Sequence, residues 1–371
     1  MKDKIERRNR DWYKIIKKIL IIDDSALMRR VVSAIINETH EYTVAYTAAN
    51  GEEGLKIIES QKDILAVICD VNMPKMTGFE LLSTIHEKGI YIPFILLSSR
   101  NDAAYTIAAL ELGALDFLRK PENLYHLESH NDFSDKLITT LKLAEEVKNK
   151  PAPTHLAPIK AHAKTENALG FTPVKAAGNK QRLVALVSST GGPRALKAVI
   201  PKLPGNLAAP VVMVQHMPVS FTATLAERLN ELSAMKVCEA ADGDVVKKGH
   251  VYLAKGGKHL KVIKKNNQEY ITLDDSPAVV GLKPCGNLMY DSLVDSIYDE
   301  IVCVVLTGMG ADGTKGIVNL AKHKKVYVIA QNEASSTVYG MPRAIYEAGL
   351  CDEVCDLNDI AKEITKKVGV L

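Results

Sequence analysis

Acidic and polar side chains follow several apolar runs near the start of the chain, where they could hold a metal ion and accept a phosphoryl group. Asp23 and Asp24 follow the first run, and Asp70 follows the third. Three carboxylates brought together raise one another's pKa, and a divalent cation such as Mg²⁺ relieves the repulsion. A carboxylate beside Mg²⁺ can accept a phosphoryl group, whose oxygens need donors such as the Ser98 hydroxyl and the Lys120 ammonium.

Each of these residue types is common, and Asp24 with Ser25 could simply cap the helix that follows them. The complete set is more specific because its members stand at the ends of successive predicted strands. Parallel strands end at one edge of a sheet, and ligands bind at that edge. The pattern therefore favours a phosphoaspartate site over a set of unrelated helix caps.

A second group of reactive residue types lies in the later part of the chain. The apolar run Leu183–Val187 leads into Ser188-Ser-Thr-Gly-Gly-Pro193, which is typical of a strand, a small-residue turn and the start of a helix. Such a turn presents a hydroxyl beside a helix N-terminus, where negative charge is favoured. The segment alone fits a nucleophilic serine and an anion-binding loop equally well. The G-x-S-x-G elbow of lipases is absent.

A nucleophilic serine needs a base, and the base needs an orienting group. His216 directly follows the apolar run Val211–Gln215, and Asp312 comes shortly after Ile301–Leu306. A histidine after a strand is often only a packed or capping residue. Ser, His and Asp at three strand ends nevertheless form the arrangement that a catalytic triad requires.

A dinucleotide site is a competing interpretation of the same region. Gly308-Met-Gly-Ala-Asp-Gly313 matches G-x-G-x-x-G after a strand, and Glu333 follows about 20 residues later, where a ribose-binding acid would stand. Asp312 would, however, repel a pyrophosphate at the helix N-terminus. Little chain also remains to complete the usual sheet. The spacing therefore favours Asp312 as an orienting carboxylate.

The elements that must position these residues alternate between strand-like and amphipathic helical patterns, which predicts two doubly wound α/β domains. Strands of the first are expected at Lys18–Ile22, Thr43–Tyr46, Leu65–Cys69, Pro93–Leu97 and Ala114–Leu118. Strands of the second are expected at Leu183–Val187, Val211–Gln215, His250–Leu253, Ile301–Leu306 and Val326–Ala330, with a two-stranded excursion around Lys261–Leu273. Between them, the stretch from Glu145 to Asn179 has the proline-rich composition of a linker.

Composition limits the class of protein. The 371 residues suffice for two or three domains, and a net charge of +3 from 47 basic and 44 acidic residues gives no footprint for nucleic acid. No apolar run approaches the length that crosses a bilayer, so we expect a cytoplasmic protein. The six cysteines are scattered without a C-x-x-C pair, which favours free thiols over metal ligands or disulfides.

The first domain resembles the response-regulator receivers, with the motif Cys69-Asp-Val-Asn-Met-Pro-Lys-Met-Thr-Gly78. The resemblance implies a CheY-like fold of five parallel strands in the order 2-1-3-4-5, with phosphorylation of Asp70. It also implies a cis bond between Lys120 and Pro121. The implied Mg²⁺ ligands are Asp23, Asp24, Asp70 and Asn72, and the implied switch residues are Ser98, Phe117 and Lys120.

The second domain resembles the CheB family of chemotaxis methylesterases. The matching segments are Ser188–Pro193, Gln215-His-Met-Pro218, Leu306–Gly313, Gln331–Ser335 and Val338–Pro342. The resemblance implies hydrolysis of glutamate γ-methyl esters on chemoreceptors, with release of methanol, and deamidation of receptor glutamines. Ser189 would then be the nucleophile, His216 the base and Asp312 its orienting group, with support from Thr190 and Met309.

The chain departs from this family's pattern in two places that are expected to line or neighbour the cleft. Cys285, Gly286 and Asn287 stand where the family usually has serine, an apolar residue and aspartate, and Lys255 stands in place of a usual proline. These changes could alter receptor preference, but neither touches the proposed triad.

The expected organisation is an N-terminal extension over residues 1–16, a receiver over 17–141, a linker over 142–179 and a catalytic domain over 180–371. The expected partners are methyl-accepting chemoreceptors as substrates and a chemotaxis histidine kinase as phosphodonor. Contact with nucleic acid is not expected, and contact with the membrane is expected only through receptors. The only cofactor expected is Mg²⁺ at the receiver, with none in the catalytic domain.

Overall fold

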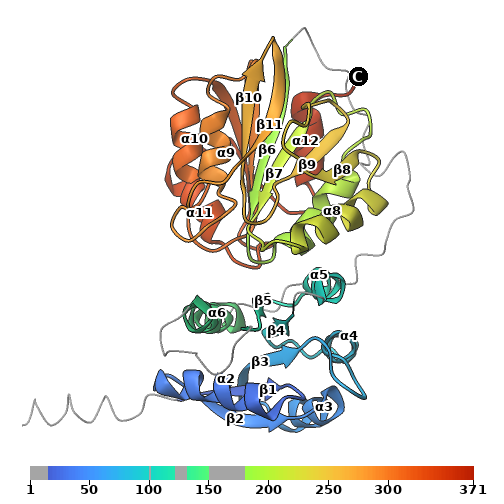
Figure 1. Cartoon of the computed structure of the whole chain (residues 1–371), viewed down its shortest axis with the longest axis vertical. Helices are drawn as coiled ribbons and strands as arrows, with labels where there is room; N and C mark the ends of the chain where they lie inside the picture. Colours follow the sequence, from blue (N-terminus) through green and yellow to red (C-terminus); the bar gives the residue numbers. More distant parts are fainter. Residues whose placement is uncertain (1–15, 100–101, 122–131, 150–179) are drawn as a thin grey trace, which may run out of the picture. The chain divides into compact units, whose positions relative to one another are not determined.

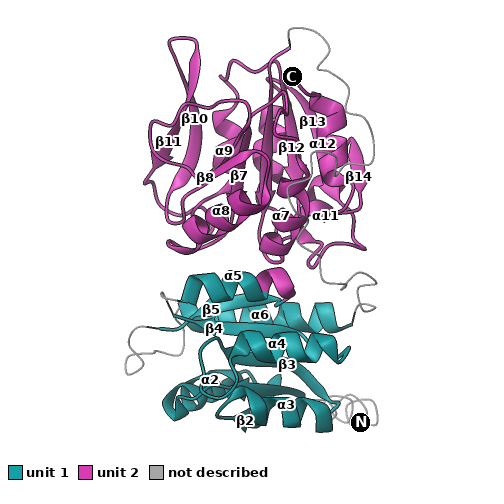
Figure 2. Ribbon diagram, turned by 90° about the vertical axis from the view of Figure 1, so that its right-hand side faces the viewer, with its two compact units in different colours: residues 1–109, 114–152 teal, residues 110–113, 153–371 magenta. Residues whose placement is uncertain are grey.

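The computed structural model describes residues 16–99, 102–121, 132–149 and 180–371. The chain divides into two compact units, which Figure 2 distinguishes by colour: residues 1–109 with 114–152, and residues 153–371 with the short segment 110–113. The expected N-terminal extension and most of the expected linker lie outside the described residues.

The first unit is built on a five-stranded sheet in the order β2-β1-β3-β4-β5, with every neighbouring pair parallel. This confirms the strand order expected for a receiver. Apolar side chains fill the central strands, and Ile19, Leu20, Ile21 and Ile22 of β1 are fully buried. The strands are β1 (Lys17–Ile22), β2 (Tyr42–Ala48), β3 (Ile64–Asp70), β4 (Phe94–Ser98) and β5 (Asp116–Arg119).

Helices follow each strand of this sheet, and polar side chains fix where three of them begin. The Asn50 side-chain oxygen accepts from the N–H of Glu53 at the start of α3. The Ser25 hydroxyl accepts from the N–H of Met28 at the start of α2, and Thr77 and Glu80 form a capping box at the start of α4. The last helix continues to Lys148, beyond residue 141 where the receiver was expected to end. The helices are α2 (Ala26–Glu38), α3 (Gly51–Ser60), α4 (Gly78–Glu87), α5 (Ala103–Leu112) and α6 (Asp132–Lys148).

The second unit contains a seven-stranded sheet in the order β14-β13-β12-β6-β7-β9-β8, again with all neighbouring pairs parallel. The predicted doubly wound architecture is confirmed. The two outermost strands, β8 and β14, were not predicted; they are short and mostly exposed or half-buried, so no apolar run marks them. The strands are β6 (Arg182–Ser188), β7 (Val211–Gln215), β8 (Lys236–Glu239), β9 (His250–Leu253), β12 (Glu300–Val305), β13 (Lys325–Gln331) and β14 (Glu353–Cys355).

Helices cover both faces of this sheet. Figure 1 shows α9 (Gly286–Ser292), α10 (Thr314–Leu320) and α11 (Gly340–Glu347) on one face, and α8 (Phe221–Leu232) and α12 (Ile360–Val368) on the other. The helix α7 (Gly192–Val199) follows β6, and a short 3-10 turn, Ile200–Lys202, continues it. An antiparallel hairpin of β10 (His259–Lys265) and β11 (Gln268–Asp274) confirms the two-stranded excursion.

The core of the second unit joins the inner strands to the covering helices. Its largest fully buried side chains include Tyr290 of α9, whose hydroxyl donates to the carbonyl oxygens of Ala185 in β6 and Val304 in β12. All six cysteines are free, as predicted. Among the residues described, no helix is both long and apolar enough to span a bilayer.

Candidate functional site

The first candidate site lies at the C-terminal edge of the sheet in the first unit. Asp23 and Asp24 follow β1, and Asp70 ends β3, the strand beside it. One carboxylate oxygen from each of the three lies within 4.8 Å of the others. Ser25 caps α2, so helix capping does not account for Asp24, which stays exposed. The three carboxylates predicted to hold a metal ion are thus brought together.

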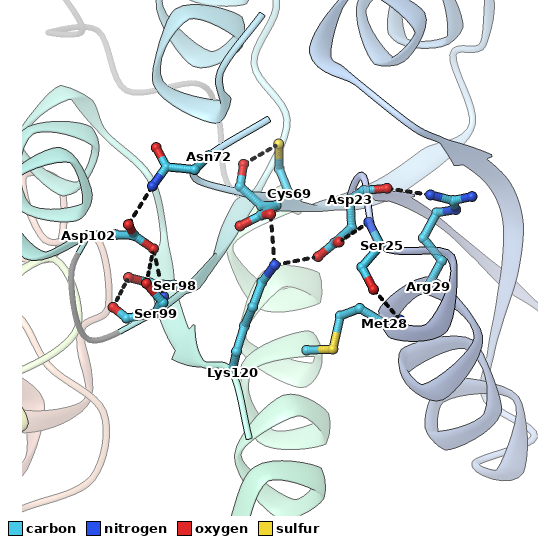
Figure 3. Close-up of polar contacts among 11 residues, drawn as sticks. Asp23, Ser25, Met28, Arg29, Cys69, Asn72, Ser98, Ser99, Asp102 and Lys120 are labelled. Atoms are coloured by element: carbon cyan, nitrogen blue, oxygen red, sulfur yellow. Dashed lines mark hydrogen bonds and ion pairs between the residues drawn. The ribbon is translucent and has the colours of Figure 1, made fainter. Parts of the chain in front are cut away.

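Lys120 reaches this cluster from the end of β5. Its ammonium lies 2.7 Å from Asp70 Oδ2 and 2.9 Å from Asp23 Oδ2, and Figure 3 shows the Lys120 side chain extending to Asp23. Burial raises the pKa of the Asp70 carboxyl to about 6, although the hydrogen bond and charge of Lys120 act in the opposite direction. A second cation at this site would lower the pKa of Asp70 again, because a nearby positive charge favours the ionised carboxylate. Three carboxylate oxygens fit the oxygen-only ligand set that Mg²⁺ prefers.

The remaining residues predicted for this site have other partners in the structure. The Asn72 side-chain amide donates to Asp102, which also accepts from the N–H and hydroxyl of Ser99 (Figure 3). The Ser98 hydroxyl lies 2.7 Å from the Thr106 hydroxyl. Asp102 was missed by the sequence analysis because it lies within a helix-like stretch and follows no strand.

Phe117 is buried, with 3% of its surface exposed, and the Lys136 ammonium lies 5.0 Å from the centre of its ring. One expectation near this residue is wrong: the cis peptide bond of the described chain is Lys283–Pro284, and the Lys120–Pro121 bond is trans. Trans is the more stable isomer of an X–Pro bond by about 0.5–1 kcal/mol, so it is adopted unless surrounding contacts oppose it.

The second candidate site lies at the C-terminal edge of the larger sheet, where β12, β6 and β7 are neighbours. Ser188 pairs with Gln215 in register, so Ser189 and His216 are the next residues on adjacent strands. The backbone N–H of His216 donates to the Ser188 carbonyl oxygen at 3.1 Å. The loop after β12 supplies Asp312 at the same edge. The three residues predicted as a triad therefore follow adjacent strand ends.

His216 and Asp312 are in direct contact. His216 Nε2 lies 2.7 Å from Asp312 Oδ2. Because a carboxylate can only accept, Nε2 carries the proton and Nδ1 keeps its lone pair in the neutral ring. Nδ1 is buried and has no hydrogen-bond partner among the described residues. The ring is thus held in one tautomer, with its other nitrogen available to accept a proton.

Asp312 accepts four hydrogen bonds, two at each carboxylate oxygen. Oδ2 accepts from His216 and from the N–H of Gly286 at 2.5 Å, and Oδ1 accepts from the N–H of Asn287 at 2.9 Å and the thiol of Cys285 at 3.2 Å. Burial by itself would raise the pKa of Asp312, but His216 and these backbone donors outweigh it and lower the pKa to about 2. The carboxylate is therefore ionised at neutral pH, as an orienting group for an imidazole must be.

The turn that carries Ser189 is held by the loop after β12. The Ser189 N–H donates to the Thr307 carbonyl oxygen at 3.0 Å, so it is already used and does not serve an oxyanion. A Cβ on Gly308 would lie 2.8 Å from Ser189 Cβ, so only glycine permits this approach. Met309 follows it with 49% of its surface exposed, and its N–H has no partner in the described part of the chain. Thr190 follows Ser189 in the same turn, and its carbonyl oxygen accepts from the Thr307 hydroxyl.

The sequence analysis missed two residues that join these segments. Gln215 is buried; its amide nitrogen donates to the Ser189 carbonyl oxygen at 2.9 Å, and its amide oxygen accepts from the Ser188 hydroxyl at 2.7 Å. The hydroxyl of Thr307 similarly links the Ser189 turn to Val338. Both residues lie in segments that match the CheB family, Gln215–Pro218 and Leu306–Gly313. Sequence pattern alone does not distinguish a supporting polar residue at a strand end from one without a role.

The dinucleotide interpretation is not favoured by this geometry. The carboxylate of Asp312 lies at the start of α10, where a pyrophosphate would have to bind, and its oxygens are engaged with His216 and the first turn of α9. A bound pyrophosphate would place like charges together at that point.

Fold and site together define a two-unit protein in which a receiver-type unit is joined to an α/β unit that carries serine, histidine and aspartate at neighbouring strand ends. Residues 19–131 match the family model described as the response regulator receiver domain, and residues 184–364 match that described as CheB methylesterase. The chain belongs to the protein-glutamate methylesterase/protein-glutamine glutaminase family.

Two curated relatives carry that name. The protein of Bacillus licheniformis is 40% identical over 351 residues, which cover 94% of this chain and 97% of the relative. The protein of Bacillus subtilis is 40% identical over 360 residues, which cover 95% and 98% of the two chains. The crystal structure of the Thermotoga maritima CheB methylesterase catalytic domain is 39% identical, with a TM-score of 0.49, and covers 52% of this chain and 100% of that chain.

Proposed function

We propose that this chain hydrolyses glutamate γ-methyl esters on chemoreceptors, releases methanol, and deamidates receptor glutamines, under the control of phosphorylation at Asp70. The observation that carries the proposal is the 2.7 Å contact between His216 Nε2 and Asp312 Oδ2, with the buried Nδ1 left without a partner. Relatives of nearly full-length similarity are named for both activities.

In this proposal Ser189 is the nucleophile. Its hydroxyl attacks the ester carbonyl carbon while His216 Nδ1 takes the hydroxyl proton, and Asp312 stabilises the imidazolium that forms. The tetrahedral oxyanion needs N–H donors that are not already used, which the Met309 N–H satisfies and the Ser189 N–H does not. Thr190 lies beside the nucleophile and has a supporting role in the same turn.

His216 then returns the proton to methoxide, so that methanol leaves and an acyl-enzyme remains on Ser189. A water molecule attacks this acyl group while Nδ1 again takes a proton, and cleavage restores the serine and frees the glutamate carboxylate. A glutamine side chain would follow the same course, with ammonia as the leaving group, because both substrates give the same acyl-enzyme. The esterase unit needs no metal ion for these steps.

The first unit is proposed to carry the regulatory phosphoryl group on Asp70. Asp23, Asp24, Asp70 and the Asn72 carbonyl oxygen would hold Mg²⁺, which neutralises the negative charge of an incoming phosphoryl group. Lys120, which already contacts Asp70, would pair with a phosphoryl oxygen. Ser98 and Phe117 are proposed to rearrange on phosphorylation, with a chemotaxis histidine kinase as the phosphodonor.

Methanol release from methyl-labelled receptor membranes tests the proposal. Wild type and Ser189→Ala would each be measured with and without a small-molecule phosphodonor and Mg²⁺. We expect release that requires Ser189 and rises with phosphodonor. Release that survives Ser189→Ala would reject the esterase site in favour of a binding module. Release that depends on Ser189 but ignores phosphodonor would reject the regulatory role of the first unit.

A further inference from the structure

The helices α9 and α10 exchange caps at their N-terminal ends, beside the proposed triad. Asp312, which precedes α10, accepts from the N–H groups of Gly286 and Asn287 in the first turn of α9. In return, the Asn287 side-chain oxygen accepts from the N–H of Gly313 at 3.0 Å and of Gly316 at 2.8 Å. Neither helix has a side-chain cap from its own N-cap residue, so each supplies the cap of the other.

Close packing of the two helices makes this exchange possible. A Cβ on Gly316 would lie 2.6 Å from the Asn287 carbonyl oxygen, so the backbones approach more closely than any other residue would allow. Figure 1 shows α9 and α10 side by side on the same face of the sheet. Asn287 therefore acts on Asp312 in two ways: its N–H donates to the carboxylate, and its side-chain oxygen holds the backbone N–H of the next residue, Gly313.

We propose that Asn287 is a positioning residue for the hydrolysis, acting on His216 through Asp312. The inference rests on the proposed function, because it concerns the same Ser189 chemistry. Without the Asn287 side chain, the Gly313 and Gly316 N–H groups lose their cap, and the loop that aims Asp312 Oδ2 at His216 Nε2 loosens. A displacement of about 1 Å in such a group can lower a rate on the order of 100-fold.

Among the groups around Asp312, Asn287 is the one whose substitution tests the positioning role without changing a charge. Among the described residues, His216 and Cys285 hydrogen-bond to its carboxylate, and Tyr290, whose hydroxyl donates to Ala185 and Val304, interacts with it through charge alone. Burial raises the pKa of Cys285 to about 11 and the pKa of Tyr290 well above its usual value, so both are neutral donors at neutral pH. Changing Asn287 to alanine therefore alters the placement of Asp312 without adding or removing a charge.

The experiment compares three variants of the full-length chain. Asn287→Ala removes the cap of α10, and Asn287→Asp keeps an acceptor oxygen there. Asn319→Ala is the matched control, because Asn319 in α10 donates to Asp291 in α9 through an exposed hydrogen bond between the same two helices. Each variant would be assayed for kcat and KM of ester hydrolysis, for the pH profile of kcat/KM, and for thermal unfolding.

We expect Asn287→Ala to lower kcat about 10- to 100-fold with KM changed less than twofold, and Asn287→Asp to recover most of that loss. Asn319→Ala should keep kcat within about twofold even where its melting temperature falls. Equal losses of kcat in Asn287→Ala and Asn319→Ala, or an unchanged kcat in Asn287→Ala, would overturn the proposal.

Proton NMR of the His216 Nε2–H gives a readout that needs no activity. In wild type this proton should resonate far downfield because it is bonded to Asp312, and Asn287→Ala should move it upfield or broaden it. Asn319→Ala should leave it unchanged. If the wild type hydrolyses no ester, the proposed function fails, but a downfield proton sensitive only to Asn287 would still support the positioning role. A proton insensitive to Asn287→Ala would overturn that role.

Discussion

Gln215 and Ser189 are joined by a 2.9 Å hydrogen bond from the Gln215 amide nitrogen to the Ser189 carbonyl oxygen. The same amide nitrogen lies 3.2 Å from the His216 carbonyl oxygen, so one buried side chain ties the end of the proposed nucleophile's strand to that of the base. An added Cβ on Gly192 would lie 1.8 Å from the Gln215 amide oxygen, so the turn can reach this amide only with glycine there.

Gln215→Leu should therefore lower both stability and activity. The change leaves the buried Ser188 hydroxyl without its partner and removes one of the two donors to the Ser189 carbonyl oxygen, which still accepts from the Gly192 N–H; the unpaired hydroxyl costs about 1–3 kcal/mol. We expect kcat to fall at least tenfold, measured as methanol release per folded molecule. Tyr252→Phe is the control, because it removes two part-buried hydrogen bonds, to Val245 and from Lys247, elsewhere in the unit. If both variants lose the same stability but kcat is unchanged in Gln215→Leu, Gln215 does not help to position Ser189 and His216.

Asp312→Asn should nearly abolish hydrolysis while the fold persists. An amide side chain cannot accept at both ends, so it either loses the His216 Nε2–H or faces the N–H groups of Gly286 and Asn287 with its own donors. A carboxylate-to-amide change of this kind lowers kcat on the order of 10⁴-fold in serine hydrolase triads. The measurement is single-turnover methanol release, with thermal unfolding as the check on folding. A loss of less than tenfold would remove Asp312 from the catalytic set.

Asp70→Asn should abolish stimulation by phosphodonor and leave basal, Ser189-dependent hydrolysis in place. The amide cannot accept a phosphoryl group in the manner of a carboxylate, while Lys120 and Asp23 still form their ion pair. Asp63→Asn, in the same unit, is a matched control because it removes an exposed carboxylate paired with Lys18. Incorporation of base-labile phosphate, as an acyl phosphate on aspartate must be, would be measured beside activity. Base-labile phosphorylation that persists in Asp70→Asn would show that another residue is the site.

Glu300 should make the second unit sensitive to acid. Burial by itself would raise its pKa, but the partners Arg182, Lys367 and Lys325 outweigh burial and lower the pKa to about 2, against a usual value of 4.5. A depressed folded-state pKa gives stability that is complete above the unfolded value and is lost as pH falls from about 4.5 toward 2.

Glu300→Gln should accordingly lower the free energy of unfolding at pH 7 by roughly 3 kcal/mol, because it leaves cations without their partner. The deficit relative to wild type should shrink as pH falls through that window. Denaturant unfolding at pH 7, 4.5 and 3 measures this. A deficit that stays constant with pH would show that packing, and not the charge of Glu300, stabilises the wild type.

The sequence by itself determined the strand–helix alternation of both units and most strand positions. Runs such as Val211–Val214 are buried on both sides of a parallel sheet, so they are continuously apolar and can be located without a structure. It also placed the reactive residue types, since Asp70 and His216 follow predicted strands directly and Ser189 stands one residue beyond another such run. Local pattern is enough to locate these residues, because a buried strand is a run of apolar residues and a polar residue follows where the strand ends.

Only the tertiary structure decided how those residues are supported. The four donors to Asp312 come from His216 and from Cys285–Asn287, segments far apart in the chain that no local spacing relates. The same holds for Asp102 beside Asn72, for the trans bond at Lys120–Pro121, and for the short strands β8 and β14. Hydrogen bonds between loops depend on how helices pack onto a sheet, and that packing sets distances to within an ångström, which a one-dimensional pattern cannot encode.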